Sequence, residues 1–218
     1  MDLAEIKVYR MIHIDNIPHV LHHGITLKSS PNKNSKFITI GDTSLIDTRN
    51  NKQVSVDNGT SSSYVTPLIT LGDFIPFYFG VRMPMLYVIQ HGGNFVERAT
   101  PAINIIYLVC SVSSIVKYSK DYYFSDGHAT DSLTTFYDKS KITDLPNIID
   151  WNAIKAPYWS GQENLNIKRK KQAEFLVSCD LPANLIVGFG CYNETAKNKL
   201  INLGILKEKI KVIPNAYY

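Results

Sequence analysis

Short segments rich in β-branched and aromatic residues constrain the fold of this chain more than any other feature. Each has the composition of a strand, and they lie at residues 6–14, 75–79, 104–110, 121–124, 172–178, 185–189 and 209–213. Helical patterns separate only some of them, so no regular strand–helix–strand alternation develops. This order is typical of an α+β fold. The phosphate-binding patterns GxGxxG and GxxxxGK[ST] are both absent, so a nucleotide bound here is not held by a Rossmann or P-loop motif.

Turn and capping signals predict where several helices begin and end. Asp15 has the character of a helix N-cap, and Gly24 that of the residue just past a helix end. Pro84 favours the first turn of a helix. A further helix is expected over residues 194–203, ended by Gly204.

Bulk composition narrows the class of protein without selecting a function. A chain of 218 residues suits one compact domain. The net charge of +4 permits a nucleic-acid partner without requiring one. Three cysteines without CxxC spacing argue against a disulfide framework. No signal-peptide pattern or apolar run of membrane-spanning length occurs. We therefore expect a cytoplasmic protein without a membrane partner, and a monomer.

The segment 28–63 is polar and unusually long for a connection, with one apolar cluster at Phe37–Ile40. Composition alone favours a mobile surface excursion, and by the same reasoning Arg49 within it is solvated. A segment of this length can also carry function. Both interpretations are open at this point.

Glu174 lies inside the apolar sequence QAEFLV. A carboxylate in such a strand is seldom buried without a partner. Strand alternation would place Glu174 with Leu176 and Ser178 on a solvent-facing side. A catalytic carboxylate is the alternative. On the half-exposed interpretation, Glu174→Ala is expected to leave the fold intact.

Lys168, Arg169, Lys170 and Lys171 form the densest run of charge in the chain. Such a run is usually a solvated loop. Four adjacent cations can also neutralise several backbone phosphates of a nucleic acid. The closeness of this run to Glu174 favours the second interpretation, since it would bring a polyanion beside a reactive acid.

Histidine and serine patterns exclude two classes of hydrolase. His19 and His23 have helical i,i+4 spacing that could hold a metal, but a surface face of the helix is the favoured interpretation. HExxH and GxSxG are absent, so zinc-dependent and serine-dependent hydrolysis have no support. We expect no metal.

Several motifs, in their order and spacing, resemble the DarT family, the toxin half of the DarTG toxin–antitoxin systems. The motifs are VYRMIHIDNIPHVLHHGI at 8–25, IPFYFGVRMPMLYVI at 75–89, FSDGHA at 124–129, IDWNAI at 149–154 with Tyr158 and Trp159 after it, and KRKKQAEFLV at 168–177. The likeness extends from about residue 6 to Tyr217 and Tyr218.

The resemblance implies an α+β ADP-ribosyltransferase-like fold, with a split, mixed β-core and flanking short helices, as a single domain over 1–218. It implies an NAD-binding element at about 33–51 and a turn-turn loop for the substrate at about 128–174. NAD+ is then a co-substrate, and ADP-ribose is transferred to a base of single-stranded DNA. The implied partner is a macrodomain-containing, DarG-type antitoxin. Thymidine is the expected target, and guanosine, RNA or protein are the alternatives.

Residue roles follow from the same resemblance. The implied catalytic residues are Glu174 and Arg49. The implied NAD+ contacts are Arg10, Met11, Ile12, His19, Leu27 and Arg49. The implied DNA contacts are Met85, His128, Tyr158, Trp159, Lys168, Arg169, Lys170 and Lys171.

Two of these assignments carry an open question. In the family the arginine at position 49 takes the proton lost by the base, but the pKa of arginine is far above neutrality. A cation that holds the NAD+ diphosphate or stabilises a deprotonated base is weighed equally. At Ile12 the chain lacks the threonine hydroxyl that many members carry, so the hydrogen bonds to the cofactor differ there.

Overall fold

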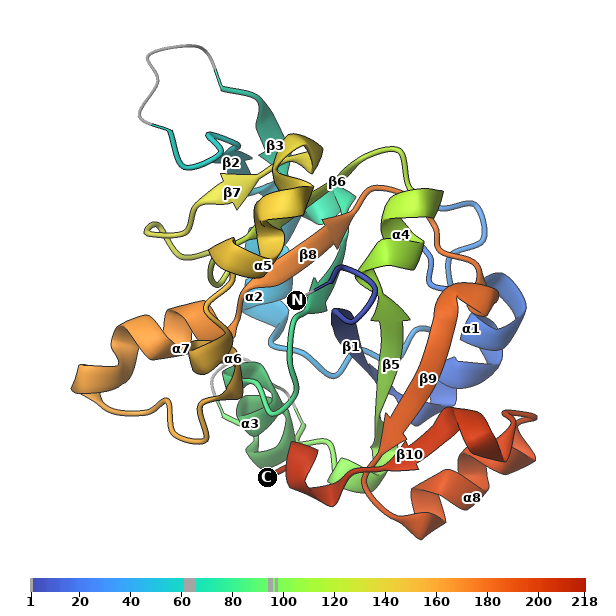
Figure 1. Ribbon diagram of the computed structural model, residues 1–218. Coiled ribbons are helices and arrows are strands. Elements are labelled where there is room, and N and C mark those ends of the chain that lie inside the picture. Colours follow the sequence, from blue (N-terminus) through green and yellow to red (C-terminus); the bar gives the residue numbers. More distant parts are fainter. Residues whose placement is uncertain (1, 61–65, 94–95, 97) are drawn as a thin grey trace.

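The computed structural model describes residues 2–60, 66–93, 96 and 98–218 (Figure 1). Its centre is one eight-stranded sheet in the order β10-β9-β5-β1-β4-β8-β6-β7, and β2 and β3 form a separate pair. The strands are β1 Lys7–His13, β2 Gln53–Ser55, β3 Leu68–Thr70, β4 Ile75–Tyr78, β5 Ile105–Ser111, β6 Tyr122–Ser125, β7 Phe136–Tyr137, β8 Glu174–Val177, β9 Ile186–Cys191 and β10 Ile210–Val212.

The sheet is divided into two halves at the junction of β1 and β4. Strand β1 pairs along its whole length with β5, from Lys7↔Ser111 to His13↔Ile105. It pairs with β4 only at Tyr9↔Tyr78. Strands β9 and β10 are parallel and the other neighbours antiparallel. The expected α+β fold with a split, mixed core is therefore confirmed.

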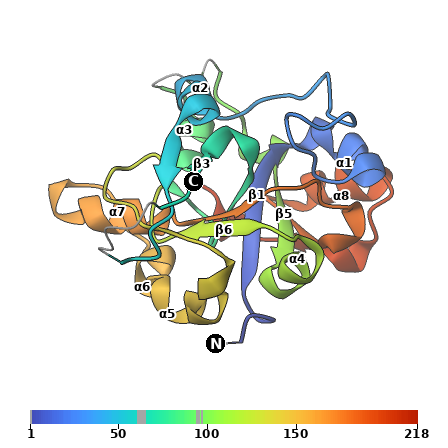
Figure 2. The same ribbon diagram turned by 90° about the horizontal axis from the view of Figure 1, so that it is seen from above.

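Short helices cover both faces of the sheet. Seen from above, α2 and α3 lie on one side of it, and α4 and α5 on the other (Figure 2). The helices are α1 Ile17–His23, α2 Thr43–Asn51, α3 Pro84–His91, α4 Val112–Tyr118, α5 Leu145–Ile148, α6 Trp151–Lys155, α7 Leu165–Lys171 and α8 Glu194–Asn202. Helix α1 and helix α7, which carries the basic run, lie on opposite sides of the molecule (Figures 1 and 2).

The core fixes which side chains of β1 face inward. Val8 and Ile12 are buried in the main apolar cluster, together with Phe77 and Phe175 from β4 and β8. Burial of this many branched and aromatic side chains is the principal favourable contribution to folding. The two sheet halves thus share one core even though their strands pair at a single position.

Most predicted boundaries are confirmed to within one or two residues. Helix α3 begins at Pro84, where the missing N–H of proline costs nothing. Gly24 follows α1 with φ +78°, and a Cβ there would lie 2.1 Å from the carbonyl oxygen of Leu181. That close approach lets Ile25 bridge to Leu181 and fixes the start of the next segment.

Three predictions were wrong in detail. Asp15 does not cap a helix, because the His13 side chain accepts the Asp15 N–H at a 3-10 turn and α1 starts at Ile17. In segment 28–63, α2 and β2 give residues 43–51 and 53–55 regular structure, while residues 28–42 contain no helix or strand; residues 61–63 lie outside the described residues. The basic run is helical, because it forms the second half of α7.

Candidate active site

A cavity of about 500 Å³ opens where the two sheet halves diverge. Its walls come from β1, β4, the segment after α1, and α2. Polar side chains that line it include Arg10, Lys28, Arg49, Tyr78, His128 and Glu174. We call it the first cavity.

Glu174 lies in the wall of this cavity and is fully buried from bulk solvent. All four residues of β8 are buried, so alternation does not give the strand a solvent face. The interpretation of Glu174 as half-exposed was therefore wrong. Its Oε1 accepts the backbone N–H of Ala129 at 3.1 Å, and its own N–H donates to Ser125 Oγ at 3.1 Å.

Arg49 forms a two-pronged ion pair with this carboxylate. Nη1 lies 2.9 Å from Oε1, and Nη2 lies 2.9 Å from Oε2. The interpretation of Arg49 as a solvated residue was wrong, because its side chain is only 16% exposed. Burial alone would lower the pKa of Arg49, but the charge of Glu174 and the hydrogen bond to it raise that pKa above the ordinary value.

Helix α2 holds Arg49 in this place. Asp42 caps the helix by accepting the N–H of Leu45 at 3.1 Å. At the other end the helix lies directly on the turn that contains Gly72. A Cβ at Gly72 would lie 2.7 Å from the Cα of Asn50, so glycine permits this close packing. Arg49 is in the last turn and projects toward β8.

Positive charge exceeds negative charge in the first cavity. Four cationic side chains line it (Arg10, Lys28, Lys33 and Arg49), against two carboxylates (Asp42 and Glu174). Burial, and then Arg49, lowers the pKa of Arg10 to about 10. Burial, Arg49 and Arg10 lower the pKa of Lys28. These cations repel one another, so the cavity is prepared for an anionic ligand.

The residues expected to contact NAD+ are only partly brought together. Met11 and Leu27 line the first cavity with Arg10 and Arg49. Leu27 is anchored there by its N–H, which donates to Asp180 at 2.7 Å. The side chain of Ile12 is buried in the core instead, so only its backbone could reach a ligand.

His19 lies outside the lining of the first cavity. Its Nε2 is 2.8 Å from the carbonyl oxygen of Asn32, so it contacts the polar segment and not the cavity itself. Its ring packs against that of His23, with 4.8 Å between the centroids. No group of three or more His, Cys, Asp or Glu side chains that could hold a metal occurs in the described ranges.

Some lining residues were missed from the sequence. Lys28 and Tyr78 both face the first cavity. Tyr78 is opposite Glu174 in the register of β4 and β8, and burial raises the pKa of its phenol, which stays a hydrogen-bond donor. Lys28 follows Leu27 directly, but only the folded chain shows that it meets Arg10 and Arg49.

A second cavity of about 620 Å³ adjoins the first, and Met85 and His128 line both. Trp159, Lys168 and Arg169 line the second one alone. Burial lowers the pKa of His128, so its imidazole is neutral near pH 7. Tyr158 is 81% exposed and is not part of either lining.

The basic run does not form one cationic surface. Arg169 pairs with Asp126 at 2.9 Å and Lys170 with Asp150 at 3.0 Å. Lys171 is buried and donates to the carbonyl oxygen of Ile154 at 2.7 Å. The prediction of four phosphate contacts was therefore wrong for Lys171, which no ligand can reach. Lys168 is exposed, with Nζ 5.6 Å from the centre of the Trp159 ring.

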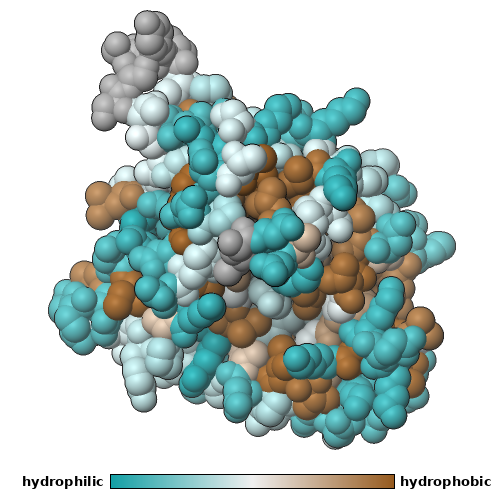
Figure 3. Space-filling view, viewed as in Figure 1, coloured by the Kyte–Doolittle hydropathy of each residue, from teal (hydrophilic) through white to brown (hydrophobic). Residues whose placement is uncertain are grey.

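The surface around α7 is mixed in character. Hydrophobic atoms interrupt the polar surface on the left side of Figure 3, the side where α7 lies in Figure 1. Leu133 and Leu165 are exposed and also line the second cavity. Apolar groups at the rim of an open cavity favour contact with flat, weakly solvated groups.

Among the described residues, no helix is long and apolar enough to span a membrane.

Two solved DarT structures share this architecture. The Thermus sp. 2.9 DarT in complex with ADP-ribosylated ssDNA is 27% identical, with a TM-score of 0.79 over 97% of this chain and 96% of that one. The same protein in complex with NAD+ gives a TM-score of 0.72 and 26% identity, over 97% of each chain.

Sequence relatives agree with the structural likeness. A DNA ADP-ribosyl transferase of Escherichia coli O127:H6 is 30% identical over 194 residues, which cover 88% of this chain and 83% of the relative. A DNA ADP-ribosyl transferase–DNA ADP-ribosyl glycohydrolase fusion protein of Thermosipho africanus is 29% identical over 211 residues, or 96% of this chain and 48% of the fusion. The family profile described as "ssDNA thymidine ADP-ribosyltransferase, DarT" matches residues 9–218. The chain therefore belongs to the DarT family of DNA ADP-ribosyltransferases.

Proposed function

We propose that this chain is the toxin of a toxin–antitoxin system and transfers ADP-ribose from NAD+ to a thymine base in single-stranded DNA, releasing nicotinamide. The observation that carries the proposal is the buried ion pair of Glu174 and Arg49 in the wall of a cation-rich cavity. Membership of the DarT family gives the reaction class. The residue assignments below rest on the geometry.

The first cavity suits NAD+ by size and by charge. Its volume of about 500 Å³ lies within the range typical of small-molecule sites. The diphosphate of NAD+ carries two negative charges, and the lining has two more cations than carboxylates. Asp42 is already engaged in capping α2, so it opposes this attraction less than its charge suggests. Binding of a dianion would relieve the repulsion among Arg10, Lys28 and Arg49.

Glu174 is assigned to the glycosidic bond of NAD+. When the bond between nicotinamide and C1′ of the ribose breaks, both electrons leave with nicotinamide, and the ribose takes on oxocarbenium character. A fixed carboxylate stabilises that positive charge only as it develops, which lowers the barrier. It can also accept a hydrogen bond from the ribose 2′-hydroxyl. Arg49 and the Ala129 N–H hold the carboxylate oxygens in place for this purpose.

The structure favours Arg49 as an electrostatic clamp over Arg49 as a base. A ring nitrogen of the target base forms the new bond to C1′ and releases one proton. An arginine whose pKa is raised by Glu174 accepts that proton poorly. His128 lies between the two cavities with a neutral imidazole, and we assign it as the acceptor.

The second cavity is assigned to the DNA strand. Trp159 and the exposed Leu133 and Leu165 offer surfaces for unpaired bases, and Lys168 offers a cation for a phosphate. A base must leave the duplex stack before it can attack a ribose carbon, so single strands are the easier substrate. Guanosine, RNA and protein remain the alternative acceptors for the experiment below.

A partner and a compartment follow from the proposed activity. The relative from Thermosipho africanus joins the transferase to a glycohydrolase in one chain, which supports a macrodomain-containing, DarG-type antitoxin that removes the modification. Cytoplasmic location is proposed because NAD+ and DNA are both present there. The three cysteines are free thiols, as expected in a reducing compartment.

The test is transfer to a panel of oligonucleotides. The protein is incubated with NAD+ and single-stranded DNA, duplex DNA or RNA, and the products are weighed and fragmented by mass spectrometry. We expect one added ADP-ribose on a thymine of single-stranded DNA. Glu174→Gln keeps the shape of the side chain and should lower the rate by on the order of 10³-fold, while Glu208→Gln, exposed and outside both linings, should not. An adduct on RNA, on protein or on guanine would move the proposal to that acceptor.

A further inference from the structure

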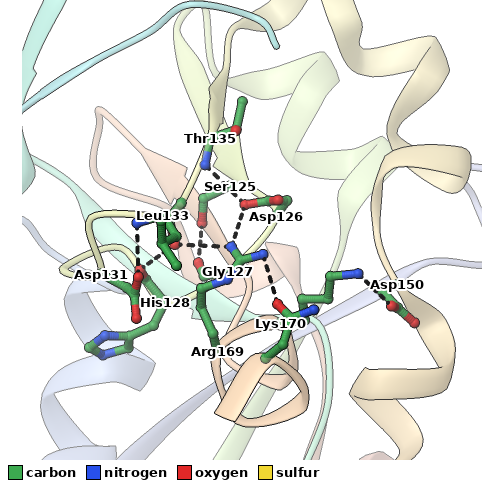
Figure 4. Close-up of polar contacts among 12 residues, drawn as sticks. Ser125, Asp126, Gly127, His128, Asp131, Leu133, Thr135, Asp150, Arg169 and Lys170 are labelled. Atoms are coloured by element: carbon green, nitrogen blue, oxygen red, sulfur yellow. Dashed lines mark hydrogen bonds and ion pairs between the residues drawn. The ribbon is translucent and has the colours of Figure 1, made fainter.

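Arg169 is exposed far less than a phosphate-binding residue would be. It belongs to the basic run, yet its side chain is only 10% exposed and turns beneath residues 125–135, which we call the His128 loop. Nη1 donates to Asp126 Oδ1 at 2.9 Å, and the same oxygen accepts the Thr135 N–H at 3.0 Å. Arg169 therefore helps to hold the two ends of the His128 loop together (Figure 4).

The guanidinium also lies directly against the loop backbone. A Cβ at Gly127 would be 2.4 Å from Arg169 Nη1, so this contact requires glycine. The Arg169 carbonyl oxygen accepts the N–H of His128 at 3.0 Å. On the other side, Arg169 Nη1 lies 3.4 Å from Thr134 Oγ1, which donates to the His128 carbonyl oxygen at 2.8 Å. Both backbone groups of His128 are thus fixed by Arg169, directly or through Thr134.

The fixed backbone leads straight to the carboxylate. Ala129, the residue after His128, donates its N–H to Glu174 Oε1 at 3.1 Å. Ser125 Oγ accepts the N–H of Glu174 at 3.1 Å and donates to the Gly127 carbonyl oxygen at 2.7 Å. A shift of the His128 loop would therefore displace the Ala129 N–H, which donates to Glu174. It would also move the His128 ring, which in Figure 4 points away from Arg169.

We propose that Arg169 is a positioning residue that holds the His128–Ala129 backbone against Glu174, and that it does not bind DNA phosphate. This step rests on the proposed function, because it takes Glu174 and His128 as the groups that act on the substrates. The guanidinium donates through Nη1 to Asp126 and Thr134 and through Nη2 to Asn166 Oδ1 at 3.3 Å, and it lies against Gly127; a lysine, with one nitrogen and no planar face, cannot make this set of contacts. A displacement near 1 Å at a catalytic group can lower a rate by about 10²-fold.

The experiment compares Arg169→Lys with Lys168→Met. Arg169→Lys keeps the charge and loses the planar fork; Lys168→Met removes the exposed charge beside it. For Arg169→Lys we expect a fall on the order of 10- to 100-fold in single-turnover transfer at saturating NAD+ and DNA. The affinity for single-stranded DNA should keep its salt dependence. For Lys168→Met the slope of log affinity against log salt should fall by about 0.7, the loss of one phosphate contact on a single strand.

Amide hydrogen exchange of the protein without substrates gives a readout that needs no activity. Arg169→Lys should speed exchange at His128 and Ala129 by about tenfold or more, because the loop that presents these N–H groups to the Arg169 carbonyl oxygen and to Glu174 Oε1 is then held less firmly. Lys168→Met should leave that exchange unchanged. Thr134→Val keeps every charge and should give a smaller change of the same kind, so it serves if Arg169→Lys folds poorly. Lys199→Met, on α8 at the opposite side of the molecule, controls for net charge.

Two results would overturn the proposal. The first is unchanged exchange at Ala129 together with an unchanged transfer rate in Arg169→Lys. The second is Arg169→Met that lowers the salt slope as Lys168→Met does, with the rate at saturation intact, since that identifies a phosphate contact. Failure of the proposed function looks different: the unmodified protein then gives no adduct on any DNA, while amide exchange still reports whether Arg169 holds the loop.

Discussion

Two groups of cations in this protein are arranged in space in a way that their positions in the sequence do not suggest. Lys168–Lys171 are adjacent in the chain and point to four different environments. Arg10, Lys28 and Arg49 are scattered through the first quarter of the chain and line one cavity. The density of charge along a sequence therefore says little about the density of charge in space.

Helix geometry explains the first group. Successive residues of a helix point about 100° apart, so four in a row cover its whole circumference. On α7 this takes Lys170 to Asp150, Arg169 to the His128 loop and Lys171 to the end of α6, while Lys168 stays outside. The second group meets because β1, α2 and the segment after α1 all converge on the gap between the two sheet halves.

Removing the carboxylate from the first cavity is expected to have the largest effect on stability. Glu174→Ala leaves the Arg49 guanidinium buried beside other cations, so the free energy of unfolding should fall by roughly 3 kcal/mol. Glu174→Gln keeps an acceptor for the Ala129 N–H but removes the same negative charge, so it should cost somewhat less, roughly 2 kcal/mol. Urea unfolding followed by circular dichroism measures both.

The same measurement on Glu208→Ala supplies the control, since Glu208 is exposed. Equal stability of Glu174→Ala and the unmodified protein would mean that Arg49 finds another partner, and that the charge balance of the first cavity is not as described. The earlier expectation of an intact fold in Glu174→Ala depended on an exposed carboxylate, which this chain does not have.

Lys171, from the basic run 168–171, gives a second test of this comparison. Its burial, and then the charge of Arg82, lowers the pKa of Lys171 to about 8, from 10.5 in the unfolded chain. Between these values the unfolded chain holds a proton that the folded one has lost, so stability rises with pH. Relative to Lys171→Met, the free energy of unfolding of the unmodified protein should rise by about 2 kcal/mol between about pH 7.5 and about pH 10.

Urea unfolding at the two pH values checks this. A parallel pH dependence of the two proteins would show that the Lys171 ammonium is not desolvated. Lys168→Met gives the matched comparison, because an exposed lysine keeps its ordinary surroundings in both states.

Strand composition and capping residues predicted most of the fold, while the site was predictable only in part. Apolar runs such as the one at 104–110 form strands whatever lies around them, and β5 follows that run closely. The burial of Glu174 was not visible, because β8 lies in the interior of the sheet and is covered on both faces. Alternation predicts exposure only for a strand with one covered face.

Long-range pairing explains the remaining errors. The ion pair of Arg49 and Glu174 joins residues 125 positions apart, and no local pattern marks either partner for the other. The α2 helix is short and polar, without an apolar stripe, so its residues looked like loop. Resemblance to the family supplied Arg49 and Glu174; it did not supply Lys28 or Tyr78, which the cavity adds.

Substitution of Tyr218 tests how Lys168, the exposed cation of the basic run, is kept in place. The Tyr218 hydroxyl accepts the Trp159 indole N–H at 2.7 Å and donates to the Arg82 carbonyl oxygen at 3.0 Å. Tyr218→Phe should lower the free energy of unfolding by about 1 kcal/mol and weaken binding of single-stranded DNA by about threefold, because Trp159 and the Lys168 ammonium near it lose their support. Tyr118→Phe, at an exposed tyrosine of α4, is the control. Unchanged DNA binding in Tyr218→Phe would separate Trp159 from the strand.

Lys28 gives the sharpest test of the convergence of cations on the first cavity. It lies at the exposed rim of the first cavity, bonded to Asn50, the residue after Arg49. Lys28→Met should weaken NAD+ binding by about fivefold, near 1 kcal/mol, and the loss should shrink at high salt. Lys117→Met, exposed on α4, should leave NAD+ affinity unchanged. Calorimetric titration with NAD+ and with single-stranded DNA distinguishes the two cation groups: Lys28→Met should change only the first titration and Lys168→Met only the second. If each variant weakened both ligands equally, the two cavities would act as one electrostatic surface, and charge density along the sequence would have been the better guide after all.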